Sequence, residues 1–133
     1  MLEVFDILKL LYDRSTLELF NIIASKGKID GKSLQSINGF TKKRYYSRTQ
    51  RLTENRLVKR QSGIFSLTSF GKVIYNRKLM LDAAVKEYYG LKAVDSIRGT
   101  KEISEEKSRE LINNIITDNR IKTVLLGRYG VKS

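Results

Sequence analysis

The 133-residue sequence contains no cysteine, histidine, proline or tryptophan. Without cysteine, neither disulfide bonds nor thiolate chemistry can contribute to the protein. Without histidine as well, the usual transition-metal ligands and the usual general base are both missing. A magnesium site made of carboxylates alone stays chemically open, but no DxD pattern marks one. We therefore expect no enzymatic activity, no catalytic residue, no metal site and no cofactor.

Long apolar runs are missing too. No run approaches the roughly 20 residues that a membrane-spanning helix needs, so we expect no membrane insertion. The first eleven residues, MLEVFDILKLL, carry Glu3 and Asp6 where a secretory signal would carry basic residues. We therefore expect a cytoplasmic protein.

Positive charge is the most unusual feature that is present. The chain has 26 lysines and arginines against 14 aspartates and glutamates, a net charge of +12. Residues 15–71 hold 11 basic and 3 acidic residues, whereas residues 1–14 are slightly negative. Such a concentrated excess indicates a surface that binds a polyanion. The alternative is a solvated face that only keeps the protein soluble.

Helix caps divide the beginning of the chain. Residues 2–12 predict an apolar helix, or a strand followed by a helix, because the apolar run is too dense to separate the two. Ser15 and Glu18 form a capping box for a second helix, which Gly27 ends. Its expected buried face consists of Leu17, Phe20, Ile23 and Ala24.

The segment 39–60 combines a narrow apolar stripe with a cationic outer face. After a turn we expect a short helix at 32–38, ended by Gly39, and then a longer helix capped by Thr41. The 3.6-residue period puts one set of side chains on the docking face: Thr41, Tyr45, Arg48 or Thr49, and Leu52. The opposite face carries Lys43, Tyr46, Ser47 and Gln50, flanked by Lys42, Arg44 and Arg51.

Two short runs rich in strand-forming residues follow, Val58–Gln61 and Ile64–Leu67. Ser62-Gly63 between them predicts a tight hairpin turn. Thr68 is expected to cap a long helix that runs to about Tyr89.

The last third predicts further helices. We expect Gly90 to end the long helix and residues 91–103 to form a connection. Ser104 and Asp118 are each expected to cap a later helix, and residues 127–133 to form a frayed tail. The predicted fold class is therefore mostly α with a small β-hairpin.

This order of elements resembles a winged helix-turn-helix domain over about residues 15–75. In that family an apolar residue and a small cap precede the recognition helix, core positions follow, and Leu-Val leads into the wing. The matching residues are Phe40, Thr41, Tyr45, Leu52 and Leu57-Val58. The wing often closes with Leu-Thr, two residues, Gly and a basic residue, as in Leu67-Thr68-Ser69-Phe70-Gly71-Lys72. The whole resembles small archaeal-type transcriptional regulators with additional C-terminal helices.

One position departs from the family pattern. The family usually has glycine before Leu-Val, where it supplies a left-handed cap, whereas this chain has Asn55-Arg56. Asparagine tolerates that conformation better than most residues, so we expect Asn55 to adopt it and Arg56 to point outward.

The resemblance implies that the helix beginning at Thr41 enters the major groove of double-stranded DNA. We expect base contacts from Lys43, Tyr46, Ser47 and Gln50. We expect phosphate contacts from Lys42, Arg44, Arg51, Arg56, Lys59 and Arg60. These expectations describe a DNA-binding transcriptional regulator associated with the nucleoid.

The flanking segments bear on assembly. Residues 1–14 are expected to pack on the core or at a dimer interface, and residues 76–133 to form a helical extension. The extension either enlarges the core or pairs with a second copy. We favour a homodimer through the helix at 68–89 and the helices after residue 104, because two-fold symmetry suits palindromic DNA. An effector ligand is left open.

Two other functions fit the same residues. A non-specific nucleic-acid-binding or chromatin-architectural protein would use the high net charge equally well. A winged-helix domain can also act as a protein-interaction module. Gln50, Ser47 and Tyr46 favour the sequence-specific reader, because a purely electrostatic binder has no use for such groups.

Overall fold

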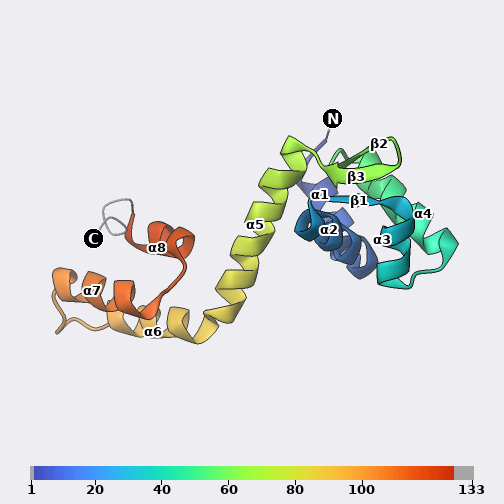
Figure 1. The fold of residues 1–133 in the computed structure, drawn as a ribbon. Helices are drawn as coiled ribbons and strands as arrows, with labels where there is room; N and C mark the ends of the chain where they lie inside the picture. Colours follow the sequence, from blue (N-terminus) through green and yellow to red (C-terminus); the bar gives the residue numbers. More distant parts are fainter. Residues whose placement is uncertain (1, 128–133) are drawn as a thin grey trace. The chain divides into compact units, whose positions relative to one another are not determined.

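The computed structural model describes residues 2–127. Within them the protein is mostly helical, with eight helices and a small three-stranded antiparallel sheet (Figure 1). The expectation of a mostly helical chain with a small β element is confirmed. The chain divides into two compact units, Met1–Asn76 and Arg77–Ser133. Apart from Gly127, the expected frayed tail lies outside the described residues.

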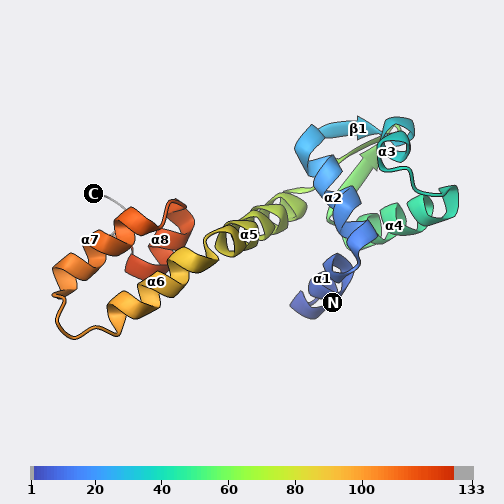
Figure 2. The ribbon, with the colours of Figure 1, turned by 90° about the horizontal axis from the view of Figure 1, so that it is seen from below.

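The first unit contains four complete helices, the sheet and the beginning of a fifth helix. In chain order these are α1 (Val4–Tyr12), α2 (Arg14–Lys26), β1 (Lys28–Asp30), α3 (Gly31–Asn38), α4 (Lys42–Glu54), β2 (Val58–Gln61), β3 (Ile64–Leu67) and the first turns of α5 (Ser69–Lys86). Helix α2 packs beside α1, α3 and α4 (Figure 2). The strands lie in the order β1-β3-β2.

The N-terminal segment is a helix from Val4, which decides between the two alternatives that its sequence left open. Ile7 and Leu10 enter the hydrophobic core of the first unit, whereas Phe5, Leu8 and Tyr12 are exposed. The helix therefore docks by one edge and leaves an apolar face outside.

Helix α2 begins earlier than expected, and its N-cap is Asp13 rather than Ser15. The Asp13 carboxylate accepts hydrogen bonds from the Thr16 hydroxyl (2.6 Å) and the Thr16 amide (3.2 Å). Arg48 Nε of α4 lies 2.7 Å from the same carboxylate. The Thr16 hydroxyl, with help from Arg48, holds the pKa of Asp13 below its ordinary value. A carboxylate at this position also interacts favourably with the positive end of the helix dipole. Asp13 is therefore a stronger cap than the hydroxyl of Ser15.

The structure adds a strand where the sequence predicted only a turn. Residues Lys28–Asp30 form β1, which pairs antiparallel with β3 in the register Ile29↔Phe65. Ile29 is buried there. A three-residue strand with one apolar side chain has no periodicity to detect, because its partner strand defines it.

The predicted hairpin is confirmed. Gln61 pairs with Ile64, which leaves Ser62 and Gly63 as a two-residue loop. Both have positive φ, 53° and 77°, as a type I′ turn requires.

The left-handed residue after α4 is Arg56 (φ 63°), and the expectation for Asn55 (φ −87°) is wrong. The amide of Arg56 donates to Thr53 O and that of Leu57 donates to Leu52 O, which together make a Schellman motif. This motif puts the left-handed residue one position after the helix cap. Asn55 instead serves the cap itself, because its Nδ2 donates to Arg51 O (2.9 Å).

The start of α5 explains the pattern from Leu67 to Lys72. The Thr68 hydroxyl donates to Arg56 O (2.5 Å) and accepts from the Gly71 amide (2.9 Å), so Thr68 caps α5 as expected. A Cβ atom on Gly71 would lie 1.9 Å from Leu57 O. Glycine is therefore needed where α5 crosses the backbone that enters β2.

The second unit contains the later turns of α5, α6 (Tyr88–Arg98), α7 (Glu105–Ile115) and α8 (Asn119–Leu126). Two expectations are wrong here. Helix α5 ends at Lys86 rather than near Tyr89, and most of the expected connection at 91–103 belongs to α6. Gly90 lies inside α6, where a Cβ atom would approach Ile115 Cγ2 to 3.2 Å. This glycine marks close helix packing rather than a helix end.

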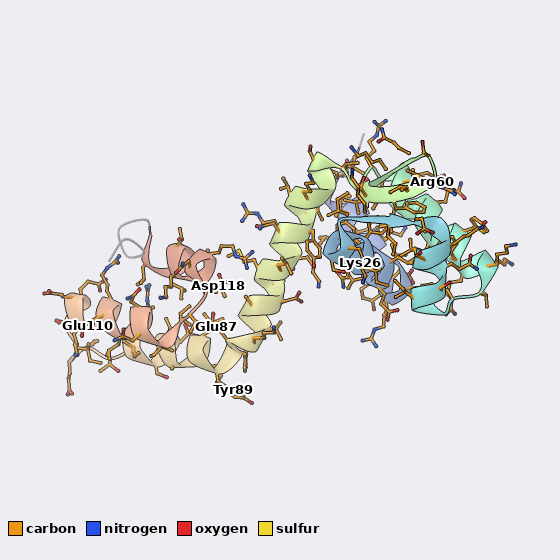
Figure 3. The ribbon with its side chains drawn as sticks, viewed as in Figure 1. Lys26, Arg60, Glu87, Tyr89, Glu110 and Asp118 are labelled. Atoms are coloured by element: carbon orange, nitrogen blue, oxygen red, sulfur yellow. The ribbon has the colours of Figure 1, made fainter. Side chains whose placement is uncertain are left out.

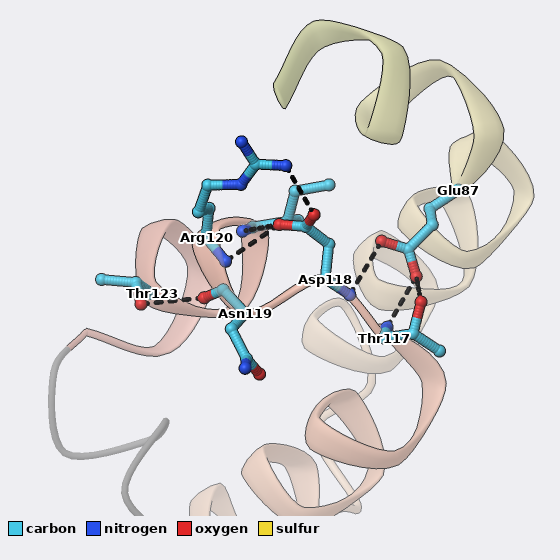
Figure 4. A network of polar contacts seen from close by, with 7 residues as sticks. Glu87, Thr117, Asp118, Asn119, Arg120 and Thr123 are labelled. Carbon is cyan, nitrogen blue, oxygen red and sulfur yellow. Dashed lines mark hydrogen bonds and ion pairs between the residues drawn. The ribbon is translucent and has the colours of Figure 1, made fainter. Parts of the chain in front are cut away.

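Polar contacts join the α5–α6 junction to the segment before α8 (Figure 4). The Glu87 carboxylate accepts hydrogen bonds from the Thr117 amide (2.6 Å), the Thr117 hydroxyl (2.8 Å) and the Asp118 amide (3.4 Å). Burial opposes the charge of Glu87, but these donors outweigh it and hold the pKa of Glu87 below its ordinary value. Asp118 in turn caps α8 and Ser104 caps α7, as expected.

No helix in residues 2–127 is long and apolar enough to cross a membrane.

Candidate nucleic-acid interface

Helix α4 has the two faces that its sequence predicts, except that Thr41, expected on the docking face, is exposed at the N-cap. Its buried residues are Tyr45, Thr49 and Leu52, with 3%, 5% and 0% of their surface exposed. Between the two alternatives at the middle of the stripe, Thr49 is the buried one and Arg48 lies at the edge. The predicted groove-facing and flanking residues are exposed, except half-buried Ser47: Lys42, Lys43, Arg44, Tyr46, Ser47, Gln50 and Arg51.

A hydrogen bond to the first residue of α3 and two hydrogen bonds within α4 and its cap help to fix this helix. The Tyr45 hydroxyl donates to Gly31 O (3.1 Å), and burial raises the pKa of Tyr45. The Thr49 hydroxyl donates to Tyr45 O (2.9 Å). Thr41 caps the first turn, as expected, by accepting from the Arg44 amide (3.2 Å). The outer face of α4 is thus carried by a helix whose inner face is fixed.

Three polar side chains along α4 have defined partners. Arg48 is held by Asp13 and donates to Ser47 Oγ (3.2 Å), so it covers the edge of the core. Ser47 keeps its hydroxyl proton for another acceptor. The Gln50 side-chain amide donates to Glu54 Oε1 (2.8 Å), and this contact orients Gln50.

The predicted phosphate-binding cations are not held in close ion pairs in the part of the chain that the structure describes. Among the ion pairs of the described residues none includes a predicted phosphate contact: Lys42, Arg44, Arg51, Arg56, Lys59 or Arg60. Arg44 lies over the Phe40 ring at 5.6 Å from its centroid. Arg56 is exposed at its left-handed position. Two carboxylates still act near these cations: Asp13 interacts with the charge of Arg51, and Asp30 lines the same surface depression as Arg60.

Lys59 and Arg60, consecutive residues of β2, point to opposite faces of the sheet. Arg60 belongs to the register row of Ile29 and Phe65, and its guanidinium lies 5.3 Å from the centroid of the Phe65 ring (Figure 3). Since side chains alternate along a strand, Lys59 points to the other face of the sheet. Arg60 lines a depression of about 360 Å³ together with Tyr46 and the turn residue Ser62. The structure brings Arg60 to the α4 surface and leaves Lys59 apart from it.

Polar residues that were not predicted from the sequence also line this depression, and one of them, Asp30, is acidic. Lys32 and Gln35 of α3 line the depression that Tyr46 and Arg60 share. Lys32 and Gln35 were hard to recognise from the sequence, because α3 is short and mixes polar with apolar residues. In the described residues, no group of three or more acidic side chains is placed to hold a metal ion.

No protein-family model, no curated protein and no solved structure matches this chain. Function is therefore inferred from the chain's own residues.

Proposed function

We propose that the protein is a DNA-binding transcriptional regulator of the winged helix-turn-helix class, with α4 in the major groove of its operator. The observation that carries the proposal is the outer face of α4. Hydrogen-bonding side chains run along its middle and cations flank them, while the inner face is anchored in the core. A major groove about 12 Å wide accepts such a helix.

The order of elements supports the same class. Helices α2, α3 and α4, the short strand β1 and the β2–β3 hairpin follow one another as in a winged helix-turn-helix domain. The Schellman turn at Arg56 stands where that family uses glycine. In this proposal the hairpin is the wing, and its tip is short, with Ser62 and Gly63 alone in the loop.

Roles follow from position on the helix. Lys43, Tyr46, Ser47 and Gln50 would contact base edges, and Gln50 would do so from an orientation that Glu54 supports. The cations Lys42, Arg44 and Arg51 would hold phosphates and set the register on the duplex. A non-specific architectural protein is the second candidate, favoured by the net charge of +12.

We further propose a homodimer formed through the second unit. Apolar side chains of the second unit are largely exposed: Leu81, Val85, Tyr88, Ile115 and Val124 are outside the core, and Leu111 is half-buried. Tyr89 adds to it with 79% of its surface exposed (Figure 3). Apolar surface of this kind is typical of association sites.

Four alanine variants of α4 test the reading of DNA. Gln50→Ala and Lys43→Ala should change the ranking of duplexes, because one base contact contributes about 1–3 kcal/mol of discrimination. Lys42→Ala and Arg51→Ala should weaken binding to all duplexes alike. Each should also lower the salt slope, which is the steepness of log K plotted against log salt concentration, by about one. Binding is measured by fluorescence anisotropy on a panel of duplexes at several salt concentrations.

Lys101→Ala is the matched control, since it removes one exposed cation from the second unit. It should leave both the ranking and the salt slope as in the wild type. If all four α4 variants kept the wild-type ranking, the assignment of α4 to the groove would be wrong.

A further inference from the structure

A hollow of about 520 Å³ lies on the face of the sheet to which Lys59 points. Three lysines from different elements line it: Lys28 of β1, Lys59 of β2 and Lys72 of α5. We call it the three-lysine hollow. Its other polar lining residues are Gln61, Ser66 and Tyr75, and its remaining walls are Ala24, Gly27 and Leu67. All of these residues belong to the first unit.

The register of the sheet explains why two of the lysines converge. Ser66 of β3 pairs with Lys28 on one side and with Lys59 on the other, so the three side chains point to one face. Neighbouring strands are about 4.8 Å apart, which puts the Cα atoms of Lys28 and Lys59 roughly 10 Å apart, with Ser66 between them. Lys72 reaches the same hollow from the first turns of α5.

No carboxylate lines the hollow, and among the described ion pairs none includes Lys28, Lys59 or Lys72. Asp30 lies on the same face of β1 as Lys28, but its carboxylate caps α3. It accepts from the Ser33 amide (3.0 Å) and the Ser33 hydroxyl (2.6 Å). The three ammonium groups therefore repel one another, and an anion bound among them would relieve that repulsion.

We propose that the three-lysine hollow binds a small anion with adjacent phosphate groups. Lysine ammonium groups bind phosphate as point charges, and Ser66 and Gln61 supply neutral donors between and beside them. A linear chain of phosphates can bridge Lys28 and Lys59 over Ser66. Tyr75 and Leu67 give the hollow an apolar wall, which suits a ligand whose phosphates are attached to an organic group.

The size of the hollow selects a small ligand over a duplex. Its volume is within the range of about 300–1,000 Å³ that is usual for small-molecule sites. A duplex is too broad to enter a concavity of this volume, so its backbone would meet only the rim. The hollow is also distinct from the α4 surface, because Lys59 and Arg60 point to opposite faces of the sheet.

Isothermal titration calorimetry of the full chain with sodium tripolyphosphate tests this proposal. Lys28→Ala and Lys72→Ala should each weaken binding at least about tenfold, the loss expected for one charge-assisted contact. The double variant should abolish the heat signal. Sulfate, a single tetrahedral dianion with fewer charges and fewer oxygens, should bind more weakly than tripolyphosphate.

Two controls separate a specific site from general attraction to a basic protein. Lys9→Ala removes an exposed cation from α1, and Lys42→Ala removes one from α4. Both should keep wild-type affinity for tripolyphosphate. Thermal unfolding should show all variants folded, because the substituted lysines are exposed.

Three outcomes would overturn the proposal. The first is no binding of tripolyphosphate to the wild type. The second is equal weakening by Lys9→Ala or Lys42→Ala, which would indicate non-specific attraction or the α4 surface. In the third, Lys28→Ala and Lys72→Ala lower affinity for a DNA duplex and leave tripolyphosphate binding unchanged. The hollow would then be a nucleic-acid contact.

Discussion

Gly71 lies in the first turn of α5, where the helix backbone meets the carbonyl group of Leu57. Gly71→Ala would put a Cβ atom 1.9 Å from that oxygen, so the helix or the strand entry must move. We expect a loss of ~3 kcal/mol in the free energy of unfolding, measured by urea denaturation.

Gly99→Ala is the matched control for this change. Gly99 has helical backbone angles, and the nearest atom to its Cβ position is Asp95 O at 3.4 Å. Little loss of stability is expected there. A Gly71→Ala protein as stable as the wild type would show that the close approach is not rigid.

Caps were predictable where a capping side chain directly precedes the helical pattern. Thr41, Thr68, Ser104 and Asp118 each cap the helix that their position indicates. The prediction failed at Asp13, because its carboxylate also serves Arg48 of a distant helix. A cap that gains a tertiary ion pair cannot be recognised from neighbouring residues alone.

Arg56 shows a second limit at this scale. The left-handed turn after α4 was predicted, but at Asn55, whose side chain favours that conformation in isolation. The Schellman hydrogen bonds require it at the next residue instead. Local preference therefore located the turn and missed its register by one.

The junction between α5 and α6 depends on one carboxylate. Because hydrogen bonds lower the folded-state pKa of Glu87, the unfolded state binds more protons in acid. This contribution to stability is therefore present above the ordinary pKa of 4.5 and is lost as pH falls through the lowered value. Glu87→Gln removes the charge and should reduce that part of the acid sensitivity of the second unit. Urea denaturation followed by circular dichroism at a series of pH values measures the difference.

Glu110→Gln is the control for Glu87→Gln. It removes a carboxylate of α7 whose described contact is an exposed ion pair with Lys107 at 3.7 Å (Figure 3). Its acid sensitivity should follow that of the wild type. If Glu87→Gln and the wild type lost stability in parallel as pH fell, the Glu87 hydrogen bonds would contribute nothing measurable.

Periodicity predicted the long elements and missed the short or interrupted ones. Helix α4 and the hairpin were located because each has its own pattern and end signals. Strand β1 depends on β3, and the division of α5 from α6 occurs at Glu87, whose partners Thr117 and Asp118 are about thirty residues away in sequence. Gly90 was misread because close packing and helix termination both favour glycine.

Assembly is the prediction that concerns the whole molecule. Light scattering at micromolar concentration without DNA should give twice the monomer mass of 15.3 kDa. Val85→Glu puts a charge on the exposed apolar surface of the second unit and should give monomers that remain folded.

Val4→Glu makes the same change at an exposed valine of α1 and should leave the dimer intact. Monomer mass for the wild type across the concentration range would remove the dimer proposal. Dissociation by Val4→Glu alone would move the interface to α1.

We propose above that α4 reads the sequence of DNA. Selection of bound duplexes from a random pool at physiological salt, with the wild type and Gln50→Ala in parallel, tests it most directly. The wild type should enrich a palindrome, and Gln50→Ala should enrich an altered one. Tight binding without enrichment, or the same motif from both proteins, would contradict it.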